Sequence, residues 1–410
     1  MRRNTTLFAR LAGAAAGFVL AAAAVVAVST PAQAASLTQV TGFGSNPGNL
    51  TMYAYRPDNL PANAPAVVLL HGCTQNGPGY FTNSGWQKFA DQWKFTVIVA
   101  GQSSANQALS CFNWFVEGDI RRGQGEALSI KQMVDHAKAN YGTDANRVFV
   151  SGLSAGGAMS AVMLATYPDV FRGGSVIAGL PYRCSPPAST STCQNSGVNK
   201  TPAAWGDLVR AAYPGYSGPY PRVSIWHGTS DYVVVPANAT ELRDQWTNVR
   251  GVSQTPTSTA SLPANTSVEV YGNNDVRVQR VSGMGHGTPV DPGSAANQCG
   301  TAGAYVLDTI CSTYYDALFF GLNGGGTNPT PTPTTGPTPP PTPTASPTPP
   351  PTTSPTCVTA SNYAHVTAGR AYQSGGYAYA NGSNQRMGLY NTFYTSALKQ
   401  TGPNYWVIGC

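Results

Sequence analysis

The amino-acid sequence predicts the α/β fold class: a mostly parallel sheet flanked by helices, followed by a small, disulfide-stapled, aromatic-rich module. Three observations lead to this prediction. Several apolar runs lack the polar alternation of a half-exposed strand, which is typical of strands covered on both faces. Segments of helical composition lie between these runs. A long Pro- and Thr-rich stretch then separates a large unit from a short tail.

Predicted strands and helices alternate along the large unit. The strands are expected at Ala66–Leu70, Phe95–Ala100, Val148–Ser151, Ser175–Ala178 and Val223–Trp226. The helices are expected at Gly125–Asn140, Ser154–Tyr167 and Thr240–Val249. In a parallel sheet of this kind, functional side chains follow the carboxyl ends of the strands.

The N-terminus, residues 1–34, is predicted to be a secretory signal peptide. Basic residues and an apolar run from Leu11 to Val28 precede Ala32-Gln33-Ala34, which has the pattern of a cleavage site. The alternative is a membrane anchor, because the run is almost long enough to span a bilayer. The glycines in the run and the cleavage site favour removal. We therefore expect a secreted, extracellular protein without a membrane partner.

The Pro- and Thr-rich stretch sets the expected domain boundaries. Residues 324–356 contain no aromatic or charged residue, so they cannot bury a core and should form an extended, polyproline-like linker. The large unit then comprises residues 35–323, and the tail comprises residues 357–410.

The charge pattern argues against nucleic acid as a partner. The formal net charge is +6, and three of the arginines that contribute to it belong to the predicted signal peptide. The sequence has no basic stripe or arginine-rich helix of the kind that nucleic acid requires.

All eight cysteines follow the predicted signal peptide. An even count in an exported chain predicts disulfides. Zinc is the alternative, but the sequence has no C-x-x-C or H-x-x-x-H spacing, so we expect neither a metal nor another cofactor. Proximity in the sequence suggests the pairs Cys184–Cys193, Cys299–Cys311 and Cys357–Cys410, which leaves Cys73 to pair with Cys111.

The sequence RVFVSGLSAGGAMS predicts a nucleophilic serine. It places G-x-S-x-G, centred on Ser154, between a buried strand and a helix. A tight strand-to-helix turn strains the serine and exposes its hydroxyl at the edge of the sheet, and the neighbouring residues must be small to clear the turn. The alternative is a glycine-rich turn that only packs a helix against a sheet.

A nucleophilic serine needs a base and an acid. In this type of fold the order along the chain is serine, acid, histidine, and His365 lies beyond the predicted linker, so His286 is the expected base. Asp231 follows the predicted strand Val223–Trp226 in a short loop and is the best-placed acid. The other carboxylates considered are Asp169, Asp207, Asp244 and Asp275, which precede that strand or lie on a helix or in a turn.

Backbone amides should complete the site as an oxyanion hole. One donor is expected to be the N–H of Ala155, which follows the serine. The second is expected from the loop after the strand Ala66–Leu70, and we assign it to the N–H of Cys73, whose disulfide with Cys111 would hold the loop rigid. Trp114 is a candidate substrate-binding residue in an apolar cleft, although it could equally be a core residue.

Four segments carry a family resemblance: LLHGCTQ, GLSAGGAMS, HGTSD and GMGHGTPVD. Together they resemble the extracellular poly(3-hydroxybutyrate) depolymerases and the related feruloyl and acetylxylan esterases, which have an α/β-hydrolase fold. The resemblance covers nearly all of residues 35–323. It implies the same roles for Ser154, Asp231, His286 and Cys73 as the argument above.

The tail resembles the C-terminal substrate-binding module of bacterial polyhydroxybutyrate depolymerases. It contains nine aromatic residues and only three Lys or Arg. A unit this small cannot bury nine rings, and exposed rings suit adsorption to an insoluble surface. The alternative, that the aromatics belong to a β core, accounts for some of them. The candidate substrate-binding residues are Tyr377, Tyr379, Tyr390 and Trp406.

The sequence therefore predicts a secreted serine esterase, expected to be a monomer, whose partner is an insoluble polymer substrate. The polymer is expected to be poly(3-hydroxybutyrate). The alternative enzyme cleaves feruloyl or acetyl esters of plant cell-wall polysaccharide. A purely adhesive protein with an inactive hydrolase domain is disfavoured, because no member of the expected triad is missing.

Overall fold

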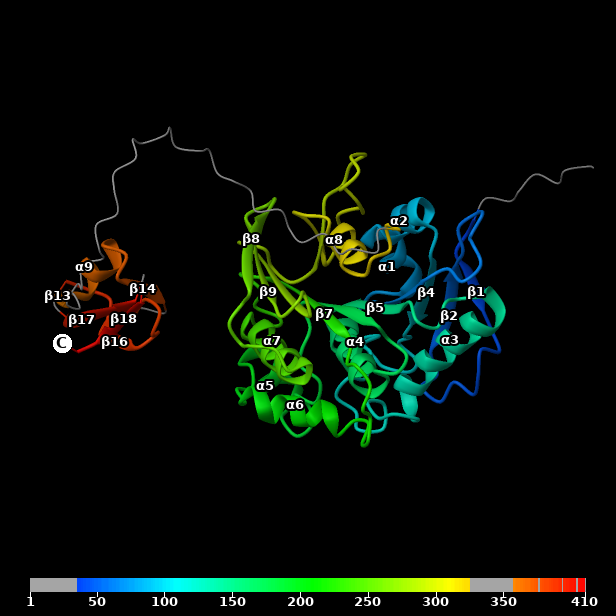
Figure 1. Ribbon diagram of the computed structural model, residues 1–410, viewed down its shortest axis with the longest axis horizontal. Helices are drawn as coiled ribbons and strands as arrows, with labels where there is room; N and C mark the ends of the chain where they lie inside the picture. The colour runs from blue at the N-terminus through cyan, green and yellow to red at the C-terminus, as the bar shows by residue number, and fades with distance from the viewer. Residues whose placement is uncertain (1–34, 325–356, 375–376, 393, 403–404, 410) are drawn as a thin grey trace, which may run out of the picture. The chain divides into compact units, whose positions relative to one another are not determined.

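The computed structural model describes residues 35–324, 357–374, 377–392, 394–402 and 405–409. The predicted signal peptide and almost all of the predicted linker lie outside these residues and remain predictions. The chain divides into two compact units, Met1–Thr335 and Gly336–Cys410. The described residues of each are called the large unit and the tail, and each is described by itself (Figure 1).

The large unit is built on a ten-stranded sheet with the order β1-β2-β4-β3-β5-β6-β7-β10-β9-β8. The six central strands, β4, β3, β5, β6, β7 and β10, run parallel to one another. At each edge two further strands are added by antiparallel pairing, β2 and β1 beside β4, and β9 and β8 beside β10. The strands are β1 (Thr38–Val40), β2 (Thr51–Tyr55), β3 (Ala66–Leu70), β4 (Thr96–Gly101), β5 (Val148–Leu153), β6 (Gly173–Ile177), β7 (Arg222–Gly228), β8 (Ser258–Leu262), β9 (Thr266–Tyr271) and β10 (Val276–Val281).

Helices cover both faces of this sheet (Figure 1). Helices α3, α4 and α7 pack on one face, and α1, α2 and α8 pack on the other. The helices are α1 (Gly77–Ser84), α2 (Trp86–Trp93), α3 (Gly125–Tyr141), α4 (Ala155–Thr166), α5 (Thr190–Asn195), α6 (Pro202–Arg210), α7 (Ala237–Arg250) and α8 (Ser312–Phe319). Two short strands, β11 (Thr288–Val290) and β12 (Val306–Asp308), form a separate parallel pair.

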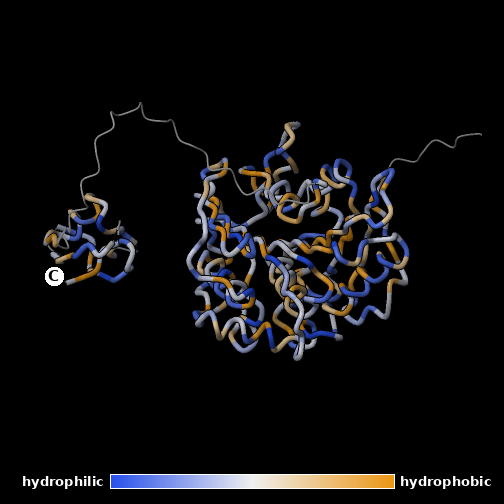
Figure 2. The backbone as a smooth tube through the Cα atoms, in the orientation of Figure 1, coloured by the Kyte–Doolittle hydropathy of each residue, from blue (hydrophilic) through white to orange (hydrophobic). Residues whose placement is uncertain are grey.

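Strand β3 shows why the central strands are apolar throughout. Its alternate residues Ala66, Val68 and Leu70 pack into the core on one face, whereas Val67 and Leu69 pack into the core on the other. Successive side chains of a strand point to opposite faces, so a strand with two covered faces has no solvent-facing position. The hydrophobic residues of these strands are orange in Figure 2.

The α/β prediction is confirmed. The five predicted strands correspond to β3, β4, β5, β6 and β7, and the three predicted helices correspond to α3, α4 and α7. The sequence reasoning did not predict the antiparallel edges of the sheet. Within the part of the chain that the structure describes, no helix combines the length and apolarity needed to cross a bilayer.

Three predicted disulfides are present in the large unit: Cys73–Cys111, Cys184–Cys193 and Cys299–Cys311. Cys357 is also disulfide-bonded. Its predicted partner, Cys410, lies outside the described residues.

The tail contains two small antiparallel sheets and one short helix. Its elements are β13 (Cys357–Ser361), α9 (Asn362–Thr367), β14 (Ala371–Ser374), β15 (Tyr377–Ala380), β16 (Arg386–Leu389), β17 (Thr395–Gly402) and β18 (Tyr405–Ile408). Its core consists largely of small and aliphatic side chains. The buried apolar residues of that core are Ala371, Ala378, Ala380, Met387, Leu398 and Trp406.

Candidate active site

Ser154 lies in the sharp turn between β5 and α4, at the carboxyl end of the central parallel strands. Its backbone angles, φ +57° and ψ −117°, are strained for a residue with a side chain. A Cβ at Gly156 would lie 2.1 Å from the carbonyl oxygen of Leu70, and one at Gly152 would lie 2.3 Å from that of Gly156. The glycines of G-x-S-x-G are therefore required by close backbone packing.

His286 and Asp231 complete a hydrogen-bonded chain with this serine. The Oγ of Ser154 lies 2.9 Å from Nε2 of His286, and Nδ1 of His286 lies 2.8 Å from Oδ2 of Asp231. Because the carboxylate can only accept a hydrogen bond, Nδ1 donates to Asp231 and Nε2 is free to accept from the serine. The structure thus brings together all three residues of the expected triad.

The loops that carry the acid and the histidine are joined to each other. The N–H of Ser230 donates to the carbonyl of Met284 at 2.9 Å, and the N–H of Gly283 donates to Oγ1 of Thr229 at 2.8 Å. A Cβ at Gly228 would lie 2.2 Å from the Met284 carbonyl oxygen, so only glycine allows this approach. Backbone contacts therefore set the distance between Asp231 and His286.

Asp231 is held as a carboxylate by several donors. Oδ1 accepts from the N–H groups of Val233 and Val234, each at 2.9 Å, while Oδ2 faces His286. Burial alone would raise the pKa of Asp231, but the hydrogen bond from His286 and the neighbouring donors hold that pKa below its usual value. The group is therefore ionised at neutral pH, as required to orient an imidazole.

The expected oxyanion donors lie on two segments that meet at Ser154. Ala155 is the first residue of α4, and Cys73 lies on the loop after β3. The disulfide with Cys111 holds this loop, and the N–H of Thr74 donates to the carbonyl of Leu109. The positive end of the α4 dipole also faces this region.

His71 fixes the same loop from inside the protein. Burial lowers the pKa of its imidazole to about 4, so the ring is neutral at physiological pH. The N–H of Gln102 donates to Nε2 at 3.0 Å, and Nδ1 therefore donates to the carbonyl of Gly72 at 2.7 Å. Both ring nitrogens are thus used to position the backbone beside Cys73.

A pocket of about 110 Å³ opens onto the serine. It is lined by Gly72, Cys73, Thr74, Gln75, Leu153, Ser154, Gln194, Val233, His286 and Tyr305. It is smaller than the roughly 300–1,000 Å³ sites that enclose drug-sized ligands, so it suits a short acyl group. In the described part of the chain, no cluster of three or more His, Cys, Asp or Glu side chains is placed to hold a metal ion.

The sequence matches the family described as esterase PHB depolymerase over residues 50–270, more than half of the chain. The chain belongs to this family. Poly(3-hydroxyalkanoate) depolymerase C of Paucimonas lemoignei is 53% identical over 311 residues, 75% of each protein. An acetylxylan esterase of Coprinopsis cinerea is 40% identical over 264 residues, 62% of this chain and 70% of that protein.

A solved structure supports the same conclusion about the fold. The acetyl xylan esterase from Aspergillus awamori has 32% sequence identity to this chain and a TM-score of 0.61, and the match covers 70% of this chain and 99% of that one. The chain is therefore an esterase with an α/β-hydrolase fold.

Trp114 does not line the pocket of this esterase, which corrects its assignment as a candidate substrate-binding residue. Its side chain is only 4% exposed and packs in a core cluster with Cys111, Ala155 and Ala158. The ring therefore belongs to the core that packs against the start of α4. A tryptophan suits either a cleft or a core, and the structure shows that Trp114 is a core residue.

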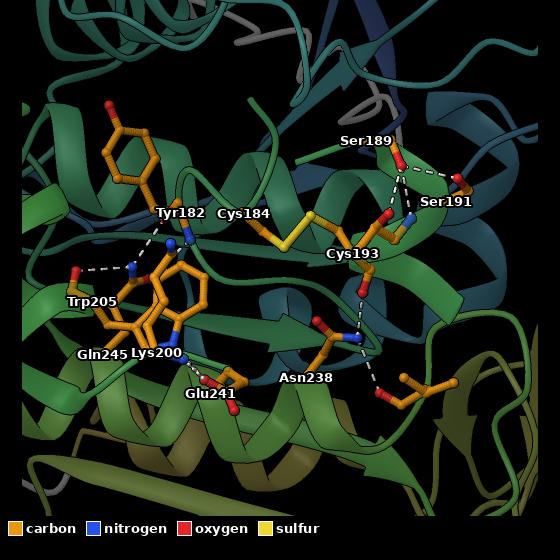
Figure 3. Close-up of a disulfide and its surroundings, with 12 residues drawn as sticks. Tyr182, Cys184, Ser189, Ser191, Cys193, Lys200, Trp205, Asn238, Glu241 and Gln245 are labelled. Atoms are coloured by element: carbon orange, nitrogen blue, oxygen red, sulfur yellow. Dashed lines mark hydrogen bonds between the residues drawn. A yellow bond between two sulfur atoms is a disulfide. The ribbon is translucent and has the colours of Figure 1, made fainter. Parts of the chain in front are cut away.

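Gln194 and Tyr305 line the pocket and were not predicted from the sequence. Figure 3 shows how the segment that carries Gln194 is fastened. The Cys184–Cys193 disulfide closes it, and Nδ2 of Asn238 on α7 donates to the carbonyl of Cys193 at 2.9 Å. The N–H of Val235 donates to the carbonyl of Gln194 itself at 2.8 Å. In the sequence, only the short spacing of Cys184 and Cys193 indicated that this segment would form a fixed loop.

The tail residues that were expected to bind substrate divide into two groups. Trp406 is buried in the small core, which corrects its assignment as an exposed binding residue. Tyr377, Tyr379 and Tyr390 are half-buried. Four further tyrosines of the tail are exposed, namely Tyr363, Tyr372, Tyr394 and Tyr405. The core interpretation thus accounts for only one of the eight aromatic residues that the structure describes in the tail.

Proposed function

We propose that this chain is a secreted esterase that hydrolyses an insoluble polyester of the poly(3-hydroxybutyrate) type. The observation that carries the reaction type is the hydrogen-bonded chain from Ser154 through His286 to Asp231. The 53% identity to a poly(3-hydroxyalkanoate) depolymerase exceeds the 40% identity to an acetylxylan esterase, and this difference supports the substrate class. Paired cysteines support secretion, since disulfides persist in oxidising compartments.

The geometry supports an acyl-enzyme mechanism. Ser154 attacks the ester carbonyl while His286 accepts its proton, and Asp231 stabilises the imidazolium that forms. The amides of Cys73 and Ala155 donate to the developing oxyanion; removal of one such donor typically costs about 3–4 kcal/mol in the transition state. His286 then returns the proton to the leaving hydroxyl, and water cleaves the acyl-enzyme in a second passage through the same steps.

The pocket supports a small, uncharged acyl unit. Its lining residues include no Asp, Glu, Lys or Arg that would attract a charged group. Its small volume suits one short hydroxyacyl repeat.

The tail supports contact with a solid polymer. Along β15, Tyr377 and Tyr379 alternate with the buried Ala378 and Ala380. Tyr372 pairs with Tyr379 across the strands, and their rings stack with centroids 5.4 Å apart. One face of this sheet therefore presents tyrosines while the other face packs on the core. We propose that this face adsorbs the polymer and that the chain acts as a monomer.

One comparison tests the proposed function. Purified enzyme is added to a suspension of poly(3-hydroxybutyrate) granules, and the loss of turbidity is compared with acetate and ferulate release from arabinoxylan. Rapid clearing of the granules with little release from arabinoxylan is expected. The opposite ranking would transfer the assignment to a plant cell-wall esterase, the function suggested by the acetylxylan esterase relatives.

A further inference from the structure

Three of the four large apolar side chains that are exposed in the described part of the large unit belong to segments beside its pocket. Among the described residues of this unit, the exposed large apolar side chains are Leu109, Val116, Tyr232 and Tyr305. Tyr305 lines the pocket, Tyr232 lies between the triad acid and the pocket-lining Val233, and Leu109 contacts the pocket-lining Thr74 through its backbone. Leu109, Tyr232 and Tyr305 are called the apolar rim.

Tyr232 is the most exposed residue of the rim, at 84%. Its neighbours in the loop are fixed, because Asp231 is buried and accepts hydrogen bonds from the N–H groups of Val233 and Val234. The loop therefore holds the tyrosine outward on a rigid support beside the pocket. A large ring in this position contributes little to the core of the large unit and leaves its apolar surface free for contact.

Leu109 is held outward in a similar way on the oxyanion side. Its side chain is 59% exposed. Its carbonyl accepts from the N–H of Thr74 at 2.6 Å, and its own N–H donates to Oε1 of Gln107 at 2.8 Å. The Cys73–Cys111 disulfide lies two residues further along the chain. The backbone is therefore fixed while the side chain remains in solvent.

Tyr305 occupies the histidine side of the pocket. Its ring lies 5.9 Å from that of His286, and the residue has a left-handed φ of +59°. Its carbonyl accepts from the N–H of Thr288, the first residue of β11. Such a conformation is unfavourable for a residue with a side chain, yet here it supports a tyrosine that is 44% exposed at the pocket.

We propose that the apolar rim is a second polymer-contact site, by which the large unit itself docks its pocket on the surface of a solid aliphatic polyester. This inference rests on the proposed function. Two loops that line the pocket, and a third that is bonded to the loop of Cys73, each carry one protruding apolar side chain, and none of the three side chains is charged. An uncharged aliphatic surface is the occupant that suits both this rim and the adjacent pocket, which Tyr305 of the rim also lines.

The rim and the tail then have different effects. The tail raises the local concentration of the enzyme at the polymer, as any tethered binding module does. The rim acts on orientation, because it lies beside the serine and brings the pocket against the surface. Loss of the rim should therefore reduce polymer hydrolysis even when the tail is intact.

The test uses the full-length chain and two substitutions outside the pocket lining. Leu109→Ser with Tyr232→Ser removes apolar surface, and the matched control Leu109→Met with Tyr232→Phe retains it. The serine variant should hydrolyse poly(3-hydroxybutyrate) granules at least about fivefold more slowly, because large apolar contacts are lost. Its kcat/KM on a short soluble ester should stay within about twofold of the parent value, a change of under 0.5 kcal/mol. The control variant should match the parent on both substrates.

Adsorption is measured separately in the Ser154→Ala background, which removes turnover. The serine pair should lower the amount of protein bound to granules at a given free concentration, and the methionine and phenylalanine pair should not.

Each other outcome overturns a specific statement. Equal granule activity of both variants would refute the rim while leaving the proposed function intact. An equal loss of kcat/KM on the soluble ester would also refute the rim proposal, because Leu109 and Tyr232 would then support the pocket itself. Loss of arabinoxylan hydrolysis alone would show that the rim meets polysaccharide. A parent enzyme inactive on granules would refute the proposed function, and the rim with it.

Discussion

Ser154 has a strained backbone conformation, and its role as a nucleophile explains why the protein keeps it. A non-glycine residue at φ +57° and ψ −117° stores strain, and the close approaches at Gly152 and Gly156 leave no room for a side chain at either position. In this turn the hydroxyl of Ser154 lies 2.9 Å from Nε2 of His286. This is the arrangement expected of a nucleophile, because the reacting atom is fixed before substrate arrives.

The first prediction concerns the proposed nucleophile and base. Ser154→Ala and His286→Ala should each lower kcat on a soluble ester by several orders of magnitude, because each removes a group that acts in the transition state. Circular dichroism should show that both variants remain folded. Near-normal turnover by either folded variant would contradict the assignment of the triad.

The second prediction concerns the acid. Asp231→Asn should lower kcat by several orders of magnitude, because an amide can donate to Nδ1 and stabilise the wrong tautomer of His286. Asp244→Asn is a suitable control, since that carboxylate pairs with Arg243 on α7 and lies outside the pocket lining. An active Asp231→Asn enzyme would require a different carboxylate as the acid.

The third prediction concerns Glu126, the buried first-turn acid of α3. Burial raises its pKa to about 8, whereas an unfolded glutamate titrates near 4.5. The folded protein therefore binds a proton that the unfolded chain releases, and stability should fall as the pH rises from about 4.5 to about 8.

Urea denaturation across this range provides the measurement. Glu126→Gln should reduce the pH dependence of the midpoint, because the titrating group is gone. The control Glu117→Gln should retain it, since the pKa of Glu117 is lowered, against the raising effect of burial, by its hydrogen bonds to Arg183 and Arg121. An unchanged slope in Glu126→Gln would contradict the prediction.

The triad could be predicted from the sequence because its constraints are local. The small residues around Ser154, the glycines around His286 and the strand before Asp231 each leave a pattern in a short segment. The residues that form the walls of the pocket leave no such local pattern. Gln194 and Tyr305 reach the site only through the packing of loops that lie far from it in the sequence, and Trp114 packs beneath α4 for the same reason.

At the scale of whole elements, the same distinction applies to the sheet. The central strands are recognisable because both faces are buried and the sequence is continuously apolar. Strands β8 and β9 at the edge are short, and exposed, half-buried and buried residues alternate only irregularly along them. Their antiparallel pairing depends on which strands lie beside them, and this cannot be predicted from the short segments themselves.

The fourth prediction concerns the loops that the disulfides hold. Eight cysteines in four pairs would leave no free thiol in the mature protein. Thiol titration of the denatured, unreduced protein should therefore find none, and prior reduction should expose all eight. Two reactive thiols would show that one expected pair is absent, and the Cys357–Cys410 pair would be examined first by peptide mapping.

At the scale of the whole molecule, the proposed roles divide between the two units, with catalysis in the large unit and polymer binding in the tail. A Pro- and Thr-rich segment is an extended spacer, so the tail should not shape the pocket, whose described lining comes entirely from the large unit. Deletion of residues 324–410 should therefore leave kcat/KM on a short soluble ester nearly unchanged. On polymer granules the rate should fall, because the tethered increase in local concentration is lost. The apolar rim would leave a residual rate.

The isolated contribution of the tail can be measured by grafting it, with the linker, onto an unrelated fluorescent protein. This fusion should bind poly(3-hydroxybutyrate) granules in preference to xylan or chitin. Its binding should depend little on salt, because the tail has only three Lys or Arg, one of which, Arg386, packs over the ring of Tyr377. Tyr372→Ser with Tyr379→Ser should weaken binding, whereas Tyr363→Ser with Tyr394→Ser, which also removes two tyrosines, should not. Equal granule activity of the full-length and truncated enzymes would show that the tail is no anchor, and preferential binding to xylan would favour the plant cell-wall esterase.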